Sequence, residues 1–370
     1  MICTERYYLA ALNAVYNLSF KKTQLLIEHF GSVTKAYEAS AQELAATHLI
    51  TAEKCSKILA SREKEYPHKL QAFCENNGVA ILTTEDSNYP LQLKNIQNPP
   101  SVLYVKGTLP DTDKAVGVVG SRKSTSYGLK VAGTFAQDLA LAGLTIISGG
   151  ARGIDTAAHK GALKANGKTI AVLGCGIDVI YPYENADLFK QISKIGAIIT
   201  EFPPGAEPLA KNFPARNRII SGFSQGILVV EAARKSGAMI TAEFAIDEGR
   251  EVYCIPGSIF SPTSVGTHSL IKQGAKLVQR PEDILEDFHL LLQKQPKEKC
   301  DMPDLFSGMS EDCEIVTNKI LTVLNFNEAK TLEEIVTASA LPLNVISSVL
   351  LNLQVNGYIA EQIGKRYIRL

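Results

Sequence analysis

The hydrophobic positions in the middle of the chain alternate between short apolar runs and longer amphipathic stretches. Residues 116–119 are apolar and end at Gly120, and residues 127–142 then carry apolar side chains at helical spacing. Residues 145–148 form a second apolar run that also ends in glycine, and the next amphipathic stretch begins at Ile154. These segments predict two consecutive strand-turn-helix units of a parallel sheet, whose buried strands are continuously apolar.

The same alternation extends over most of the chain. Further strands are predicted at residues 79–83, 102–105, 169–173, 197–200, 227–230, 252–255 and 276–278. Further helices are predicted at residues 154–165, 186–194, 238–248, 264–273 and 281–292. A proline-rich stretch, residues 202–214, interrupts the pattern, and we expect the helix after it to start near Asn217. The order predicts an α/β fold over residues 79–292, an extended Rossmann-like core with a doubly wound parallel sheet.

A helical domain is predicted before this core, over residues 1–70. Its helices are expected at residues 7–16, 23–30, 33–39, 41–46 and 52–61. Short helices around the break at Gly31 suggest a SAM-like or helix-hairpin-helix unit. The turn at residues 47–50 contains no glycine, whereas DNA-binding hairpins use glycine to bring backbone N–H groups to a phosphate. We therefore favour a protein-contacting or structural role over DNA contact.

A small domain is predicted after the core. Residues 293–314 are polar with mixed charges and read as a linker, and residues 315–370 follow as a domain. Three helices and then two strands around Gly364 give the order of a winged helix. The helix at residues 343–356 has the place of a recognition helix but contains no Lys or Arg, so we favour protein contact over DNA reading.

Composition limits the possible partners and cofactors. Lys and Arg together number 38, as do Asp and Glu, so any basic surface must be local. The 7 cysteines form no C-x-x-C pair and have no zinc-like spacing to histidine, so we expect free thiols in a reducing cytoplasm, with no metal. The chain has no run of about 18 apolar residues, so neither export nor a membrane span is predicted.

Three strand-to-helix turns are candidates for phosphate binding. The carboxyl ends of parallel strands meet at one edge of a sheet, where helix N-termini and bare backbone N–H groups attract anions. Two of the turns also carry a guanidinium. The candidate residues are Gly120, Ser121 and Arg122 in the first turn, Gly149, Gly150 and Arg152 in the second, and Lys235, Ser236 and Gly237 in the third.

Residues 211–218 carry the strongest local charge bias of the core. Cations suit phosphates, amides suit phosphates or bases, and an aromatic ring offers a stacking face, which together suit single-stranded nucleic acid. The alternative is a solvated basic turn with its aromatic ring in the core. The candidate residues of this stretch are Lys211, Asn212, Phe213, Arg216, Asn217 and Arg218.

Catalytic and cofactor motifs are weak. The segment 161–169 resembles a phosphate-binding GKT loop but has five residues between its glycines and runs from a helix into a strand. Gly174 and Gly176 lack the third glycine of a dinucleotide site. Asp155 and His159 could pair on one helix face, which is more often structural than catalytic. The residues therefore predict no cofactor and no enzyme.

The motifs taken together resemble the DNA-processing protein A family (DprA, also called Smf). Their order and spacing cover nearly the whole chain, and the flanking modules resemble those of longer family members. The motifs are Tyr89-Pro90, Pro99-Pro100, GSR at 120–122, SGGARGID at 148–155, Tyr181-Pro182, NFPARNRIISG at 212–222, EAARKSGAMITA at 231–242 and IPGS at 255–258.

The resemblance implies a role that the residues alone do not show. Members of the family are homodimers that bind single-stranded DNA in a basic pocket of the Rossmann-like core. They protect incoming DNA in natural transformation and load the RecA recombinase onto it. The resemblance places in the pocket Arg122, Gly149, Gly150, Arg152, Lys211, Asn212, Phe213, Arg216 and Arg218, although Lys211 stands where many relatives have a small residue.

The alternative is a nucleotide-binding or nucleoside-monophosphate-cleaving enzyme. The core is more distantly similar to proteins that release a base with a P-G-G-x-G-T-x-x-E loop. The corresponding residues 235–243 lack the paired glycines but keep Thr241 and Glu243. Helix propensity accounts for Glu243, so we favour DNA binding.

Overall fold

The computed structural model describes residues 4–289, 311–325, 329–355, 357–362 and 364–369. It separates into two compact units, one of residues 1–123 and 132–291 and the other of residues 124–131 and 292–370. Within the described ranges, no single helix has the length and apolar composition of a membrane span. One pair of helices, Leu332–Ser339 with Leu343–Gln354, meets those criteria only when taken together, and it is bent by 115°.

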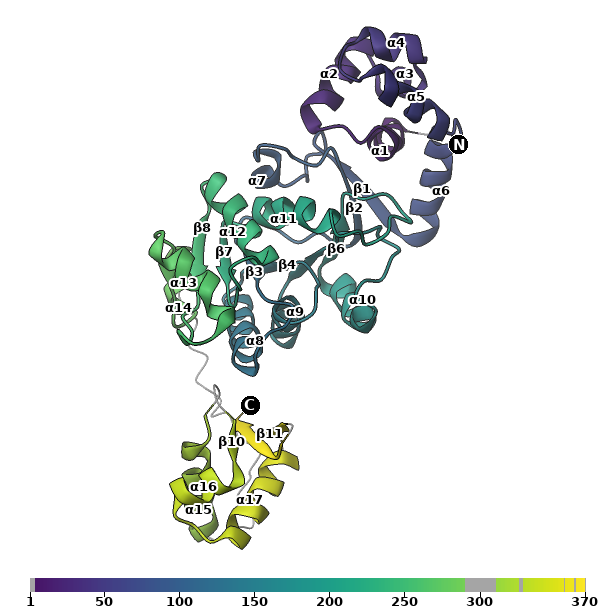
Figure 1. The fold of residues 1–370 in the computed structure, drawn as a ribbon. Helices are drawn as coiled ribbons and strands as arrows, with labels where there is room; N and C mark the ends of the chain where they lie inside the picture. The colour runs from purple at the N-terminus through teal and green to yellow at the C-terminus, as the bar shows by residue number, and fades with distance from the viewer. Residues whose placement is uncertain (1–3, 290–310, 326–328, 356, 363, 370) are drawn as a thin grey trace. The chain divides into compact units, whose positions relative to one another are not determined.

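A nine-stranded sheet forms the centre of the first unit (Figure 1). Its order is β1-β2-β6-β5-β4-β3-β7-β8-β9. The strands from β6 to β9 are parallel, and every residue of β3 to β7 is buried, which explains the continuously apolar runs. The strands are β1 (Val79–Thr83), β2 (Val102–Gly107), β3 (Ala115–Val119), β4 (Thr145–Ser148), β5 (Thr169–Val172), β6 (Ala197–Thr200), β7 (Gly226–Val229), β8 (Glu251–Cys254) and β9 (Lys276–Leu277).

The predicted α/β fold with a mostly parallel sheet is confirmed, but the sheet is not parallel throughout. Strand β2 runs antiparallel to both β1 and β6. An apolar run predicts a buried strand but carries no information on its direction, so the sequence pattern could not show this reversal.

The topology creates a crevice beside β3. From β3 the chain proceeds through β4 and β5 to β6 on one side, then returns to β7, β8 and β9 on the other side. The sheet is therefore extended first on one side of β3, by β4, and later on its other side, by β7, which pairs directly with β3. In open α/β sheets the carboxyl ends of strands at such a switch point form the binding crevice.

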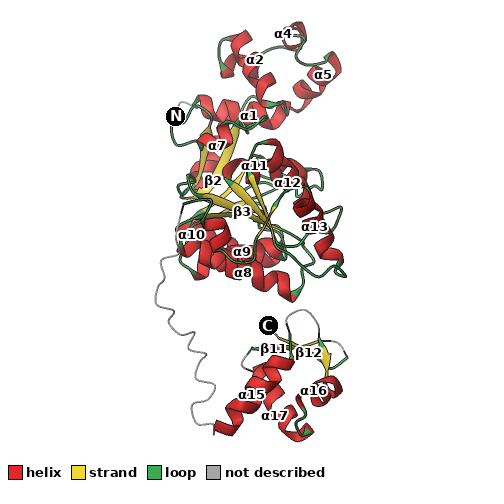
Figure 2. Cartoon of the chain, turned by 90° about the vertical axis from the view of Figure 1, so that its left-hand side faces the viewer, coloured by secondary structure: helices red, strands yellow, loops and turns green. Residues whose placement is uncertain are grey.

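Helices cover both faces of the sheet. Figures 1 and 2 show α8 (Ser126–Leu141), α9 (Ile154–Lys164) and α10 (Ala186–Ile195) on one face. Helices α11 (Asn212–Phe223) and α12 (Gly237–Asp247) cover the other face. After β8 the chain continues through η2 (Pro262–Ser264), α13 (Val265–Lys272) and α14 (Glu282–Leu285).

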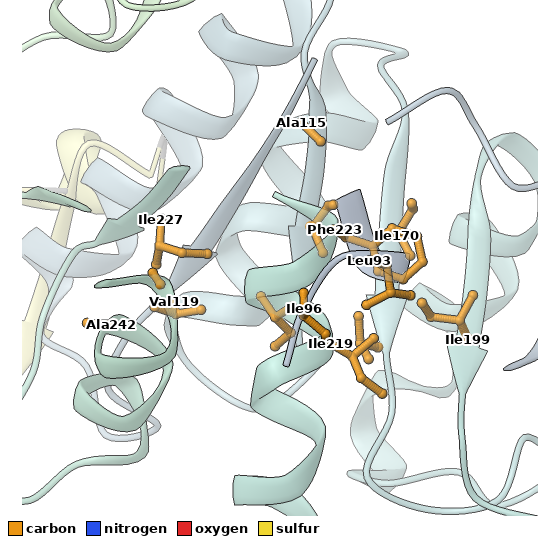
Figure 3. Packing of buried hydrophobic residues seen from close by; sticks show 14 of the residues in the cluster. Leu93, Ile96, Ala115, Val119, Ile170, Ile199, Ile219, Phe223, Ile227 and Ala242 are labelled. Carbon is orange, nitrogen blue, oxygen red and sulfur yellow. The ribbon is translucent and has the colours of Figure 1, made fainter. Parts of the chain in front are cut away.

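The main hydrophobic core lies between α11, α12 and the sheet. Ile219 and Phe223 of α11 pack against Leu93 and Ile96, as Figure 3 shows, together with buried strand residues such as Ile199. Leu93 belongs to α7 (Leu91–Lys94), a short helix that the sequence pattern did not predict. This core holds α11 firmly against the sheet, so the position of its first turn is fixed.

The predicted start of α11 near Asn217 is wrong. The helix begins at Asn212, five residues earlier, and Pro214 lies in its first turn. Proline is tolerated there because the first N–H groups of a helix have no intrahelical acceptor. The basic stretch is therefore helical, and its side chains point to different sides, with Asn212, Arg216 and Asn217 buried.

The first five N-terminal helices pack around a core of their own, and Leu70 and Cys74 of the sixth pack with strand residues of the sheet. The helices are α1 (Glu5–Tyr16), α2 (Phe20–Phe30), α3 (Val33–Glu38), α4 (Ala41–Ala46), α5 (Ala52–Ser61) and α6 (Tyr66–Asn77), of which α6 was not predicted. Arg62 binds them together, because its Nη1 donates to the carbonyl of Ala39 (2.7 Å) and to the hydroxyl of Tyr16 (3.1 Å). Arg6 donates to the carbonyl of Ile81 (3.0 Å), which ties α1 to the sheet.

The second unit contains a small helical module with a three-stranded antiparallel sheet. Its elements are α15 (Glu311–Val323), β10 (Lys330–Thr331), α16 (Leu332–Ser339), α17 (Leu343–Val355), β11 (Ile359–Gln362) and β12 (Arg366–Arg369). The strand order is β10-β12-β11. Of the predicted linker 293–314, residues 293–310 lie outside the described residues, and residues 311–314 belong to α15.

Gly161 offers a test of the packing between α8 and α9. A Cβ on Gly161 would lie 2.3 Å from the carbonyl oxygen of Gly133, so Gly161→Ala forces the helices apart. We expect a loss of about 1–3 kcal/mol in the free energy of unfolding, measured by urea denaturation. Gly133→Ala is the matched control. Its Cβ would be 3.8 Å from the nearest atom, the carbonyl oxygen of Ala157, and alanine favours helix, so stability should hold or rise. Equal losses in both variants would contradict this packing.

Candidate functional site

A cavity of about 730 Å³ lies at the carboxyl end of β3, at the switch point of the sheet. Its walls come from the turn after β3, the first half of α11 and the N-terminal turns of α12. Tyr181 and Thr263 complete the rim from two other loops. Eight of the predicted site residues line this cavity: Gly120, Ser121, Arg122, Phe213, Arg216, Asn217, Ser236 and Gly237.

The turn after β3 presents cations to the cavity. Gly120 is required there, because a Cβ would lie 2.6 Å from Cγ1 of Ile154 and 3.0 Å from the carbonyl oxygen of Glu231. The Ser121 hydroxyl donates to the carbonyl of Lys123 (2.8 Å) and accepts from its N–H (3.1 Å), so Ser121 shapes the turn. Arg122 and Lys123 are exposed, and neither forms an ion pair among the described residues, although the Arg122 charge acts to lower the pKa of the buried Asp155 in the same cavity.

An aromatic wall stands beside these cations. The Phe213 ring packs on Gly174, where a Cβ would lie 2.9 Å from the ring. The Arg122 guanidinium carbon lies 4.8 Å from the Phe213 ring centroid, and the Tyr181 ring centroid lies 5.6 Å from it. Phe213 is half-buried between Gly174 and the Arg122 guanidinium but lines the cavity, so its role as a stacking face stays a prediction. Tyr181 and the planar Arg122 guanidinium are the surfaces that this wall offers to solvent.

Arg216 lies beneath this wall and is 3% exposed. Its Nη1 donates to the carbonyls of Gly149 (2.7 Å) and Val172, and its Nε donates to Oδ1 of Asn217 (3.3 Å). Burial lowers the pKa of Arg216 to about 10, so the guanidinium stays charged at neutral pH. Arg216 therefore joins α11 to the ends of β4 and β5 and is largely engaged by the protein itself.

The second predicted phosphate turn is filled by the protein. Oδ2 of Asp155 accepts from the N–H groups of Gly149 (3.1 Å) and Ala151 (3.3 Å). Burial raises the pKa of Asp155, and the nearby Arg216 charge opposes that rise. Gly150 has a φ of +63°, and a Cβ there would lie 2.7 Å from the Phe189 ring. A carboxylate thus occupies the place that the sequence pattern assigned to a phosphate.

Two further predicted cations are paired with acids. Arg152 binds Glu184 at the surface, with 3.1 Å between Nη2 and Oε2. Arg218 binds Glu201, with 2.6 Å between Nη2 and Oε2, and both side chains are largely buried. The predicted site residues outside the cavity lining are Gly149, Gly150, Arg152, Lys211, Asn212, Arg218 and Lys235.

The N-terminus of α12 forms the wall opposite Arg122. Asn217 donates from its side-chain amide to the carbonyl of Gly237 (3.1 Å), and the Thr241 hydroxyl donates to the same carbonyl (3.3 Å). Ser236 precedes the helix, but its side chain makes no capping hydrogen bond. Its Oγ is buried with no partner among the described residues, at the wall of the cavity. The third predicted turn therefore keeps unused hydrogen-bonding capacity at the cavity wall.

Comparison with known proteins agrees with this architecture. Residues 80–289 match the model of a family described as DNA recombination-mediator protein A. Protein Smf of Synechocystis sp. is 34% identical over the whole of both chains. The chain belongs to the DNA recombination-mediator protein A family.

Solved structures of related proteins share the fold. The X-ray structure of DNA processing protein A from Streptococcus pneumoniae has a TM-score of 0.67 and 36% identity. The match covers 77% of this chain and 98% of the Streptococcus pneumoniae chain. A structure concerning the single-stranded DNA binding mode of DNA processing protein A from Helicobacter pylori has a TM-score of 0.52 and 29% identity, and covers 57% of this chain and 95% of its own.

The cavity also contains residues that the sequence pattern did not point to. Lys123 and Tyr181 line the cavity, as does Thr263. Lys123 follows Arg122 in an exposed turn, so its charge was a usable signal. Tyr181 and Thr263 lie 59 and 141 positions after Arg122, so only folding brings them to the rim.

The structure gives no support to the alternative of a nucleoside-monophosphate-cleaving enzyme. Glu243 is exposed and lies outside the cavity lining, because α12 turns Thr241 inward and Glu243 outward. The carboxylate in the lining belongs to Asp155, which is bound to backbone N–H groups. Among the described residues no group of three or more His, Cys, Asp and Glu side chains could hold a metal.

His159 is a buried neutral residue beneath the cavity. Its Nδ1 lies 2.7 Å from the Thr169 hydroxyl, which donates its own proton to the carbonyl of Ile146 (2.8 Å). Nδ1 must therefore carry the proton, and Nε2 is buried without a partner among the described residues. Burial, and secondarily the Arg216 charge, lowers the pKa of His159 to about 3. The expected pairing of Asp155 with His159 is not seen, because Asp155 accepts from the N–H groups of Gly149 and Ala151 whereas His159 binds Thr169.

The lowered pKa of His159 predicts a pH dependence of stability. Between pH 6.5 and 3 the unfolded chain binds a proton at this histidine but the folded chain does not, so stability is lost as pH falls through that window. His159→Asn should remove a slope of up to about 1.4 kcal/mol per pH unit from the free energy of unfolding. Urea denaturation at pH 7, 6 and 5 measures it, and the exposed His29→Asn serves as control. Parallel pH profiles for wild type and His159→Asn would contradict a buried neutral imidazole.

Proposed function

We propose that this chain binds single-stranded DNA in the cavity after β3. The observation that carries the proposal is the meeting of unpaired cations and planar surfaces at one switch-point crevice. Arg122 and Lys123 supply positive charge, and Tyr181 with the Arg122 guanidinium supplies faces for stacking. The Helicobacter pylori relative, whose structure concerns single-stranded DNA binding, supports the same ligand for this chain.

A single strand suits this site better than a duplex. Stacking on Tyr181 or on a guanidinium requires an unpaired base with a free face, worth about 1–3 kcal/mol per base. A duplex offers phosphates but keeps its bases stacked on each other. Because the chain has a net charge of zero, attraction must come from the few free cations around the cavity. Binding should therefore be salt-sensitive and show little sequence preference.

The predicted residues, together with Lys123, divide into two groups in this proposal. Arg122, Lys123 and the Ser236 turn at the start of α12 contact phosphates, and exposed Lys211 and Lys235 attract the backbone nearby. The second group shapes the cavity from beneath or beside it. It consists of Gly120, Ser121, Gly149, Gly150, Arg152, Asn212, Phe213, Arg216, Asn217 and Arg218.

The wider role is that of a recombination mediator. We propose that the bound strand is protected and then passed to the RecA recombinase, in natural transformation or another recombination task in the cytoplasm, by a homodimer formed through the core. The family membership supports the mediator role. The matching test is RecA filament assembly on DNA coated with single-strand-binding protein. The chain should accelerate assembly, and Arg122→Ala should lose that effect.

The end modules are proposed to contact proteins. The order α15, β10, α16, α17, β11, β12 supports a winged helix for residues 315–370, and the small helices before residue 70 support a SAM-like unit. On α17, Leu343 and Leu351 are 55% and 64% exposed, and the helix carries no Lys or Arg. An exposed apolar surface without cations suits a protein partner better than a phosphate backbone.

Arg122→Ala tests the proposed binding site directly. We expect about tenfold weaker binding to labelled oligo-dT at moderate salt, because the variant loses both a phosphate contact and a stacking surface, with an unchanged fold. Fluorescence anisotropy at two salt concentrations, with single- and double-stranded oligonucleotides, measures the effect.

Arg152→Ala is the matched control for this experiment. Its guanidinium is exposed like that of Arg122, but it is paired with Glu184, so its removal should change affinity less than twofold. Unchanged affinity in Arg122→Ala, or equal affinity for duplex and single strand, would refute the proposed site.

A further inference from the structure

An exposed apolar pair lies next to the cavity and has no role in the site described above. Phe260 is 89% exposed and Ile259 is 78% exposed, and both belong to the loop between β8 and η2. Thr263, three residues later, lines the cavity rim. Large hydrophobic side chains this exposed, side by side and adjoining a proposed binding site, indicate a contact surface.

The loop that carries this pair is well anchored. The N–H of Phe260 donates to Oγ of Ser258 (3.3 Å), and the N–H of Ser261 donates to the carbonyl of Ser258 (3.0 Å). The carbonyl of Thr263 accepts from the N–H of Ala232 (2.7 Å), in the loop between β7 and α12. The exposure of Phe260 is therefore built into a hydrogen-bonded loop that is fixed to the wall of the cavity.

Free cations occupy the neighbouring loop. Arg234 and Lys235 come two and three residues after Ala232. The N–H of Gly266 donates to the carbonyl of Ala232 (2.7 Å), so the two loops are held together. Both side chains are exposed, and neither has an ion pair or hydrogen bond among the described residues. Cations next to an exposed aromatic ring are the combination that proteins use to track a single strand.

We propose that Phe260 is a second stacking platform, on which a base of the same DNA strand rests after the strand leaves the cavity past Thr263. Arg234 and Lys235 hold the phosphates between the two positions, and Ile259 shields one side of the stacked base. A DNA strand suits these charges better than a second copy of the chain. Two copies docked loop to loop would place their cations against each other. The inference rests on the proposed DNA binding in the cavity.

The absence of tryptophan from the chain provides a direct test. Phe260→Trp introduces the sole tryptophan, and stacking with a thymine base should quench its fluorescence when oligo-dT is added. Leu91→Trp is the matched control, because Leu91 is also an exposed residue, at 70%, and lies outside the cavity lining. Its emission should not change. Binding without quenching at Phe260→Trp would overturn the proposal.

Affinity measurements give a second, independent readout. Phe260→Ala should weaken binding of a long oligo-dT about fivefold and leave the binding of a very short one unchanged, because only the long strand reaches the platform. Phe260→Tyr, which keeps an aromatic ring, should restore most of the affinity. Equal affinities in all three proteins would overturn the proposal while leaving cavity binding intact.

The remaining outcomes separate the proposal from its alternatives. If Phe260→Ala turns a DNA-free dimer into a monomer in analytical ultracentrifugation without changing DNA affinity, the loop is a contact between copies and the platform is refuted. If neither the wild type nor any variant binds oligo-dT at low salt, the proposed function itself fails. If Arg122→Ala weakens DNA binding but Phe260→Ala does not, the second platform is refuted and the binding site in the cavity stands.

Discussion

The buried guanidinium of Arg216 is the interaction on which the geometry of the site depends. A buried charge is costly unless hydrogen bonds satisfy it, and this one is satisfied by the carbonyl groups at the ends of β4 and β5. Because those carbonyls belong to the sheet, Arg216 fixes the first turn of α11 over the carboxyl edge. Phe213, in that turn, is thereby placed on Gly174, and Arg122 lies on Phe213.

The same arrangement separates the cations of the core by function. Arg216 donates to backbone carbonyl groups and Arg218 pairs with Glu201, both inside the protein. Arg152 pairs with Glu184 at the surface. Within the described part of the chain, Arg122 and Lys123 form no ion pair, and both line the crevice. A chain without net charge can in this way present a local positive edge, because its acids neutralise the cations that build the site and leave the others free.

The sequence predicted the framework of the core, and eight of its fifteen candidate residues line one cavity, but it did not show which candidates the protein itself engages. Apolar runs that end in glycine identified β3 and β4, and the crevice after β3 followed from the alternation of strands and helices. The assignment of Gly149 to phosphate failed, because an acid six positions later folds back onto its N–H group. The helical course of residues 212–216 was missed because Pro214 stops a helix everywhere except in its first turn.

Photo-cross-linking tests the central claim most directly, that the crevice after β3 holds a single strand. Full-length protein is bound to oligo-dT in which one thymidine is replaced by 4-thiothymidine, irradiated, digested and analysed by mass spectrometry. The structure predicts cross-links to Tyr181, Phe213 or the turn at residues 120–123. Cross-links confined to α17 or to the N-terminal helices, with the DNA bound, would contradict the account.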